Sequence, residues 1–260
     1  MILLTPAFVS AQSGPSEEEL ARKAQNPIAD LISVPFQNNT NFNVGPSDNE
    51  RTQDILNIQP VIPFQISEDW NLITRTITPL IWQPTFGEGS DPTFGLGDIN
   101  PTFFFSPRKP GEFIWGVGPT ATFPTATDDR LGSGKWSMGP AAVGLVITGP
   151  WVVGALVNNQ WSVGGESDRR SVNQFLFQYF INYNFKGGWY LTSAPILTSN
   201  WNAPEGDKKW TVPFGGGVGK IFHIGRLPVN AQVQSFYNVQ NPDYGSDWSL
   251  RTQLQFLFPK

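Results

Sequence analysis

From residue 171 to residue 185, alternate side chains differ sharply in character. One parity carries Phe175, Phe177, Tyr179, Ile181, Tyr183 and Phe185, and the other is rich in amides, with Gln174, Gln178, Asn182 and Asn184. A β-strand points alternate side chains to opposite faces. A soluble sheet buries its aromatic face and fills its wet face with Lys and Glu, but this wet face is nearly uncharged. The pattern predicts a strand of a transmembrane barrel, with lipid outside and a polar lumen inside.

The composition of the whole chain supports the same class. Only 15% of the 260 residues are charged, against about 25% in soluble domains. Ten Trp and twenty Phe accompany a mean hydropathy of only -0.22, and no window approaches about 18 uninterrupted apolar residues. A barrel with one surface facing lipid and the other facing water fits these values better than a helical membrane protein does. The net charge of -4 and the absence of a basic stripe argue against a nucleic-acid partner.

Alternation and turn signals predict about twelve strands, and we expect an all-β fold, an antiparallel up-and-down transmembrane barrel with a short N-terminal helix. The predicted strands are 31–44, 52–65, 70–82, 94–106, 113–124, 136–147, 151–161, 171–185, 189–201, 209–222, 228–239 and 247–258. The barrel therefore occupies residues 31–260.

Two segments precede the predicted barrel. Residues 1–11 resemble the end of a secretory signal peptide, with small residues at Val9-Ser10-Ala11 before Gln12. Residues 12–30 form a helical segment, in which Ser16 caps a helix over Glu17–Gln25 and acidic residues follow at its positive end. This helix is too short and polar to span a membrane, so it lies below the barrel or partly inside its lumen.

The connections between the predicted strands alternate in length. Short turns, such as Thr148-Gly149-Pro150, alternate with longer and more charged loops, such as Pro124 to Lys135. Outer-membrane barrels have this asymmetry, with short periplasmic turns and long extracellular loops. All ten Trp lie near predicted strand ends, where indole rings favour the membrane interface.

Several segments resemble a known bacterial family. They are the segment Glu19 to Pro27, Gly95-Leu96-Gly97-Asp98, Pro124-Thr125-Ala126-Thr127, Leu131 to Trp136, Trp210-Thr211-Val212-Pro213 and the closing Phe256 to Lys260. Together they resemble the outer-membrane transporters grouped with the "MetA-pathway of phenol degradation" proteins, some of which carry the label neuromedin U. The resemblance spans most of the chain. It implies an outer-membrane barrel with a transport role, and it supplies no ligand residues.

The chain offers little for catalysis. His223 is the only histidine, it lies in a predicted turn, and no Ser–acid pair is evident near it. Gly132-Ser133-Gly134-Lys135 lacks the upstream glycine and the following helix of a phosphate loop, and we interpret it as an extracellular turn. We expect no enzymatic activity, no cofactor and no metal site. A lipid-modifying enzyme remains an alternative that substitution of His223 would test.

Candidate lumen residues are the polar side chains on the inward parity of the strands. A charge facing lipid would cost about 2–4 kcal/mol, so the charged members belong inside, where they form either a constriction or a structural ion pair. Phe104 and Phe236 share this parity and are candidate stacking points for an aromatic ligand. The lumen or constriction candidates are Arg75, Asp98, Arg251, Gln59, Gln174, Gln178, Asn182, Gln232, Gln234 and Gln253.

The sequence thus predicts a bacterial outer-membrane channel or facilitator for the passive transport of small molecules. The family label adds aromatic or hydrophobic compounds as permeants. The alternatives are a non-conducting structural or adhesion barrel with a plugged lumen and, for a different compartment, a soluble sandwich. The expected partners are outer-membrane lipid, lipopolysaccharide, the outer-membrane assembly machinery and the permeant itself.

Overall fold

The computed structural model describes residues 16–45, 51–85, 91–205 and 208–259. The predicted signal remnant, residues 1–11, and the start of the predicted helical segment lie outside these described residues. The described elements are α1 (Glu17–Ala24), β1 (Ile32–Phe42), β2 (Thr52–Ile58), β3 (Val61–Gln65), β4 (Trp70–Gln83), β5 (Thr93–Leu96), β6 (Asn100–Pro107), β7 (Phe113–Thr122), β8 (Lys135–Thr148), β9 (Trp151–Gly165), β10 (Asn173–Asn184), the 3-10 helix η1 (Lys186–Gly188), β11 (Trp189–Ser193), β12 (Ile196–Asn200), β13 (Trp210–Ile224), β14 (Leu227–Gln240) and β15 (Trp248–Phe258).

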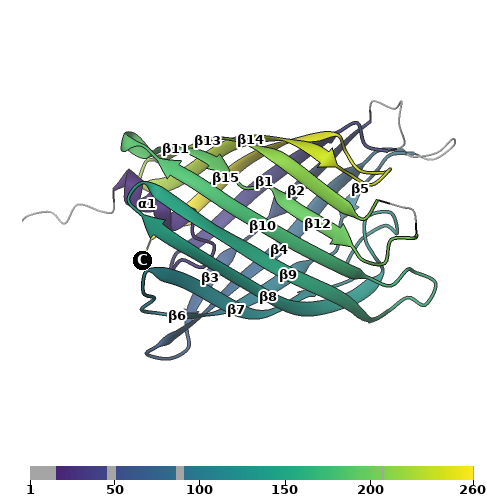
Figure 1. Cartoon of the computed structure of the whole chain (residues 1–260), viewed down its shortest axis with the longest axis horizontal. Coiled ribbons are helices and arrows are strands. Elements are labelled where there is room, and N and C mark those ends of the chain that lie inside the picture. Colours follow the sequence, from purple (N-terminus) through teal and green to yellow (C-terminus); the bar gives the residue numbers. More distant parts are fainter. Residues whose placement is uncertain (1–15, 46–50, 86–90, 206–207, 260) are drawn as a thin grey trace, which may run out of the picture.

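The strands form a closed, twelve-stranded antiparallel barrel (Figure 1). Three of the twelve are interrupted, which divides them into β2 and β3, β5 and β6, and β11 and β12. Pro60 and Pro195 lie at two of these interruptions, because proline has no N–H to donate to a ladder. The first and last strands pair along their whole length, from Ile32 opposite Phe258 to Phe42 opposite Trp248. The predicted fold is confirmed.

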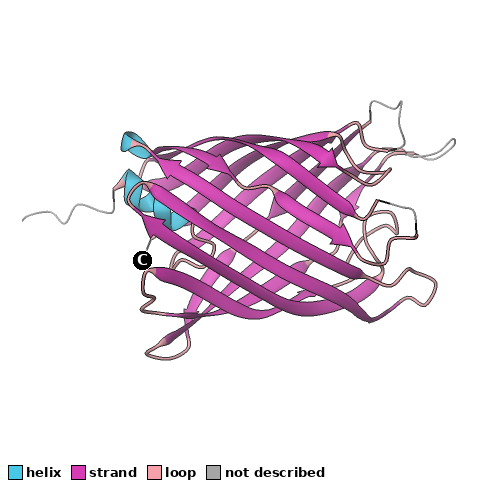
Figure 2. Ribbon diagram, in the orientation of Figure 1, coloured by secondary structure: helices cyan, strands magenta, loops and turns pink. Residues whose placement is uncertain are grey.

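The connections differ between the two ends of the barrel (Figure 2). Both helices and the short turns lie at one end, where the chain also finishes, and the longer loops lie at the other. Between β8 and β9 the turn contains only Gly149 and Pro150, since Thr148 pairs directly with Trp151. Gly149 has a φ of 53°, a conformation that a residue without a Cβ adopts at little cost.

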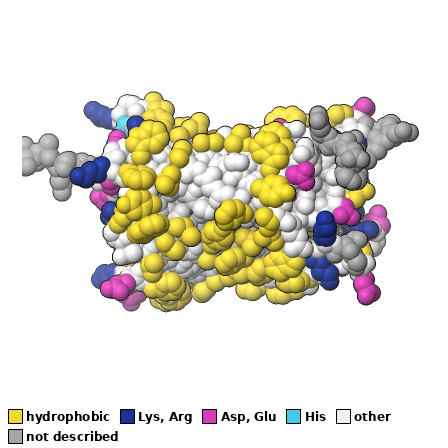
Figure 3. Space-filling view, turned by 45° about the horizontal axis from the view of Figure 1, so that its top comes forward, with side chains coloured by type: hydrophobic (Ala, Val, Ile, Leu, Met, Phe, Trp, Pro, Cys, Tyr) yellow, Lys and Arg dark blue, Asp and Glu magenta, His cyan; other side chains and the backbone are white. Residues whose placement is uncertain are grey.

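On the face of the barrel that Figure 3 shows, hydrophobic side chains cover much of the outer wall and the charged side chains gather towards the two ends. Trp70, Trp115, Trp151 and Trp189 lie towards the helix end, and Trp82, Trp136, Trp161, Trp201, Trp210 and Trp248 towards the loop end. Trp201 and Trp210 are in edge-to-face contact, with ring centroids 5.4 Å apart. Two belts of indoles flanking an apolar wall are typical of an outer-membrane barrel, and the chain is an outer-membrane protein.

The N-terminal segment closes part of the helix end. Leu20 and Ala21 of α1 pack against Leu31, Ile221 and Leu257, all of them buried. Among the described residues, no helix is long and apolar enough to cross a membrane. The segment after α1 continues into the lumen, where Ile28 joins a buried apolar cluster with Phe104 and Phe180.

Candidate functional site in the barrel lumen

The two halves of the inner wall differ in chemistry. Inward side chains of β4, β6, β8, β9 and β10 form an apolar cluster that contains Ile73, Phe104, Ala141, Val143, Leu145, Val152, Leu156 and Phe180. On the opposite side, β14, β15 and β1 present amides and hydroxyls. The strand β8 is apolar on both faces, so its sequence carries no alternation from which this inner apolar wall could be predicted.

A chain of hydrogen bonds joins the polar half of the wall, and it runs from β11 across β13 to β14, β15 and β1. The hydroxyl of Tyr190 donates to Oδ1 of Asn230 at 2.6 Å. Nδ2 of Asn230 donates to Oε1 of Gln255 at 3.0 Å, and Nε2 of Gln255 donates to Oγ of Ser33 at 3.1 Å. Each of these four side chains therefore has a hydrogen-bond partner, as buried polar groups require.

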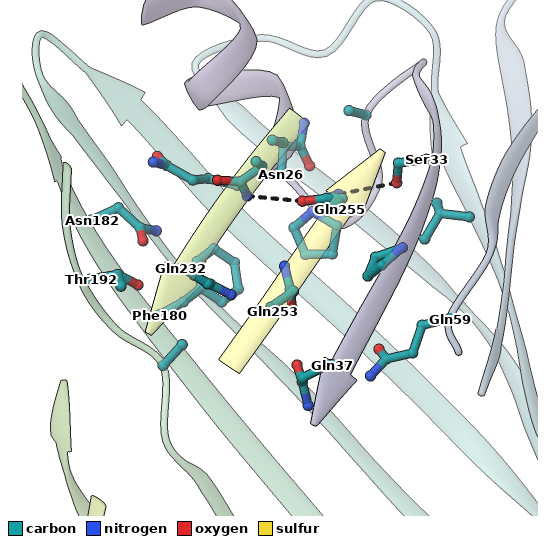
Figure 4. A pocket seen from close by; sticks show the side chains of 18 of the residues that line it. Asn26, Ser33, Gln37, Gln59, Phe180, Asn182, Thr192, Gln232, Gln253 and Gln255 are labelled. Carbon is teal, nitrogen blue, oxygen red and sulfur yellow. Dashed lines mark hydrogen bonds between the residues drawn. The ribbon is translucent and has the colours of Figure 1, made fainter. Parts of the chain in front are cut away.

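A cavity of about 150 Å³ lies between this wall and the N-terminal segment. Figure 4 shows Gln232, Gln253 and Gln37 projecting into it from neighbouring strands. Residues 23–27 and Ala29, together with Leu31, close its helix side. The predicted helical segment therefore contributes to the lumen lining.

Six of the seven predicted amides come together at this cavity. Gln59, Gln178, Asn182, Gln232, Gln234 and Gln253 all line it. Gln234 is only 2% exposed. Its Oε1 accepts a hydrogen bond from the backbone N–H of Ala194 at 3.1 Å, and Ala194 lies outside the sheet at the interruption beside Pro195. Gln174 lies apart from the others, beside Asn200 and Arg169.

Arg75 and Arg251 also line the cavity. Nη2 of Arg75 donates to Oε1 of Gln59 at 2.6 Å. Arg251 donates from Nε to Asn39 at 2.9 Å and from Nη1 to the carbonyl of Ala194 at 2.8 Å. The partners of both guanidinium groups in these bonds are neutral.

Asp98 has partners different from those that the sequence led us to expect. Its carboxylate accepts from the backbone N–H and the hydroxyl of Ser133, at 2.7 and 2.8 Å, and from the N–H of Ala126. Among the described residues it forms no ion pair with Arg75 or Arg251. The strand is interrupted at Gly97–Ile99, and there Asp98 anchors the long loop that follows β7. The expectation that Asp98 forms a constriction or an ion pair with the inward arginines is therefore wrong.

Phe104 and Phe236 point inward but have no free face. They are 0% and 1% exposed. Phe104 packs in the apolar cluster, and the ring of Phe236 lies beneath the guanidinium of Arg251, 4.8 Å from its centre. In this structure the two rings pack and support their neighbours, and the interpretation of them as exposed stacking points for a ligand is corrected.

Several lining residues were not among the predicted candidates. Tyr190 lies between Trp189 and Leu191 on the inward parity, so the alternation alone could have identified it. Ser33 and Gln37 could have been identified in the same way, from the alternation in β1. Lys23 and Asn26 could not, since the sequence of a short helical segment before a barrel does not reveal which of its side chains enter the lumen.

The remaining titratable groups of interest lie at the two ends. In the loop after β7, Arg130 donates to both carboxylate oxygens of Asp128 and lowers the pKa of that carboxyl to about 2. At the other end, Nδ1 of His223 lies 3.9 Å from Oε1 of Glu17. In the described part of the chain, no group of three His, Cys, Asp or Glu side chains is placed to hold a metal ion.

Comparison with solved structures supports the architecture. An outer membrane channel from Pseudomonas putida F1 matches with a TM-score of 0.64 and 17% identity, over 87% of this chain and 93% of that chain. An outer membrane phospholipase from Salmonella typhi matches with a TM-score of 0.43 and 13% identity, over 95% of this chain and 99% of that chain. The likeness to the Pseudomonas putida channel, at 17% identity, concerns the fold.

Comparison with curated proteins finds no match. A family model does match, over residues 33–260, which is nearly all of the barrel. This match confirms the resemblance seen in the sequence, and the chain belongs to the family described as "Putative MetA-pathway of phenol degradation".

Proposed function

We propose that this protein is a channel or facilitator through which small molecules cross the outer membrane passively. The observation that carries the proposal is a closed barrel whose interior holds a cavity lined by amide side chains from several strands. Amides both donate and accept hydrogen bonds, so such a wall can replace the water around a polar solute. The family membership and the channel from Pseudomonas putida F1 support the same function.

The finer proposal concerns the permeant. The family description names phenol degradation, and one side of the cavity is apolar, with Val61, Leu156 and Phe180. A wall that is amide-rich on one side and apolar on the other suits a compact molecule with a polar group and a hydrocarbon or aromatic part. We propose such aromatic or hydrophobic compounds as permeants, and lipopolysaccharide and the outer-membrane assembly machinery as the partners of the outer wall.

Liposome swelling tests the transport function. Liposomes that contain the protein are placed in isotonic solutions of sugars, amino acids or phenols, and the swelling rate is measured by light scattering. We expect faster swelling than in protein-free liposomes, with phenols ahead of sugars of similar size. Swelling no faster than in protein-free liposomes for every solute would contradict the proposal.

One observation favours the non-conducting alternative. Ile28 is only 5% exposed and lies inside the lumen, in the apolar cluster, so the N-terminal segment occupies part of the bore. Planar-bilayer recordings of the full chain and of a variant without residues 12–28 separate the two functions. A channel gives openings in the full chain, or at least in the truncated one. A structural barrel gives none in either, although both show the heat-dependent gel shift of a folded barrel.

We also propose that the protein is not an enzyme. The only histidine, His223, lies beside Glu17 at the barrel end, and the chemistry of the lumen is that of hydrogen bonding. Loss of a measured lipid-modifying activity on His223→Ala would contradict this view.

A further inference from the structure

The charged side chains that line the lumen cavity are all positive. They are Lys23, Arg75 and Arg251, and no Asp or Glu is among its lining residues. Lys23 is neutralised by Glu19, whose carboxylate lies 2.8 Å from its ammonium group. The two arginines, from β4 and β15, have no such partner among the described residues.

Both arginines are held by neutral acceptors. Gln59 binds Arg75, whereas Asn39 and the carbonyl of Ala194 bind Arg251. Within the described residues these contacts occupy one of the five N–H donors of Arg75 and two of those of Arg251. The contacts orient the guanidinium groups without neutralising them, and Arg251 is only 6% exposed.

Both guanidinium groups line the same small cavity, so two positive charges share one confined space. Placing like charges in a poorly solvated space is costly, and an anion between them removes most of that cost. Arginine pairs with carboxylates through two parallel N–H···O bonds, which are stronger than bonds between neutral groups. Because the hydrogen-bond acceptors of both arginines are neutral, the cavity stays positively charged and is complementary to an anion.

The other walls limit what the anion can be. Val61, Leu156 and Phe180 provide an apolar surface in the same cavity. Its volume of about 150 Å³ is similar to that of an apolar cavity that accommodates one benzene ring. A small organic carboxylate with a compact hydrocarbon part satisfies the charge, the surface and the size together.

We propose that Arg75 and Arg251 form a binding site for the carboxylate of a small organic anion inside the lumen. The site would be a binding site along the permeation path of the proposed channel, and to this extent the proposal rests on that function. Its occupation can nevertheless be measured on the detergent-solubilised full chain without any transport, so failure of binding and failure of conduction are distinguishable.

Isothermal titration calorimetry with benzoate, against benzyl alcohol as the neutral analogue, tests the site. We expect saturable benzoate binding to the natural chain, weakened about 10-fold or more in Arg75→Gln and in Arg251→Gln, because each loses charge-assisted hydrogen bonds. Lys220→Gln, on the outer wall against Trp189, is the matched control and should bind benzoate as the natural chain does. Benzyl alcohol should bind all four proteins alike.

The proposal is overturned if benzoate gives no saturable heat with the natural chain, or if both glutamine variants bind it unchanged. Arg251→Lys is the control for misfolding, since this substitution keeps the positive charge and removes only the planar guanidinium group that can form two parallel hydrogen bonds. It should bind benzoate more weakly than the natural chain and more tightly than Arg251→Gln. Equal affinity of the lysine and glutamine variants would contradict a site that depends on charge. Binding without conductance would uphold the site and refute the channel.

Discussion

At the scale of single residues, the inner wall depends on where glycine is placed. A Cβ at Gly219 would lie 2.1 Å from the ring of Tyr190, which is 2% exposed and begins the hydrogen-bond chain to Asn230. The absence of a side chain at Gly219 therefore lets the Tyr190 ring pack directly against β13.

Replacing Gly219 by Val should therefore displace the Tyr190 ring and lower the free energy of unfolding by about 1–3 kcal/mol, the usual cost of overpacking. Urea unfolding in lipid vesicles, followed by tryptophan fluorescence, measures it. Gly164→Val is the control, because a Cβ at Gly164 meets nothing within 4 Å. Equal destabilisation by the two substitutions would show that the loss comes from the glycine backbone and not from Tyr190.

At the scale of elements, α1 is tethered to the 3-10 turn η1. Oε1 of Glu18 accepts from the backbone N–H of Gly187 at 2.9 Å. This hydrogen bond is the main reason that the pKa of Glu18 lies below its usual value of 4.5. Since the folded pKa is lowered, the tether contributes above pH 4.5 and is lost as the pH falls through the folded value.

Glu18→Gln should accordingly increase amide hydrogen exchange in α1 at neutral pH, and the difference from the natural chain should shrink as the pH falls through the lowered pKa of Glu18. Exchange measured by mass spectrometry over a descending pH series tests it. Glu19→Gln, which removes only the half-exposed pair with Lys23, should have a smaller effect at neutral pH. A difference between Glu18→Gln and the natural chain that persists at low pH would contradict the tether.

At the scale of the whole molecule, the barrel has a fixed inside and outside. Gln178 lines the lumen cavity, and Phe177 and Tyr179, its neighbours in β10, point to the opposite face. Spin labels at positions 177 and 179 should be quenched by lipid-soluble relaxation agents, and labels at 174 and 178 by water-soluble ones. The reverse pattern would mean that the barrel is inside out and would refute the assignment of its faces.

The sequence by itself determined the number of strands, their boundaries to within a few residues and, in the strands that alternate, the face presented to lipid. These properties follow from alternation and turn signals, which are local; β8, which is apolar on both faces, is the exception. Two of the three charged side chains expected inside also follow, because Arg75 and Arg251 lie on the inward parity of long alternating runs.

Only the tertiary structure decided which inward side chains meet. Arg75 and Arg251 come from strands far apart in the chain, and their presence in one cavity depends on the closure and stagger of the barrel, which no local pattern encodes. Asp98 has the right parity, yet the interruption at Gly97–Ile99 directs it to Ser133. The entry of Ile28 into the lumen likewise depends on the apolar inner wall, to which β8 contributes Ala141, Val143 and Leu145, because that wall forms only once the barrel has closed.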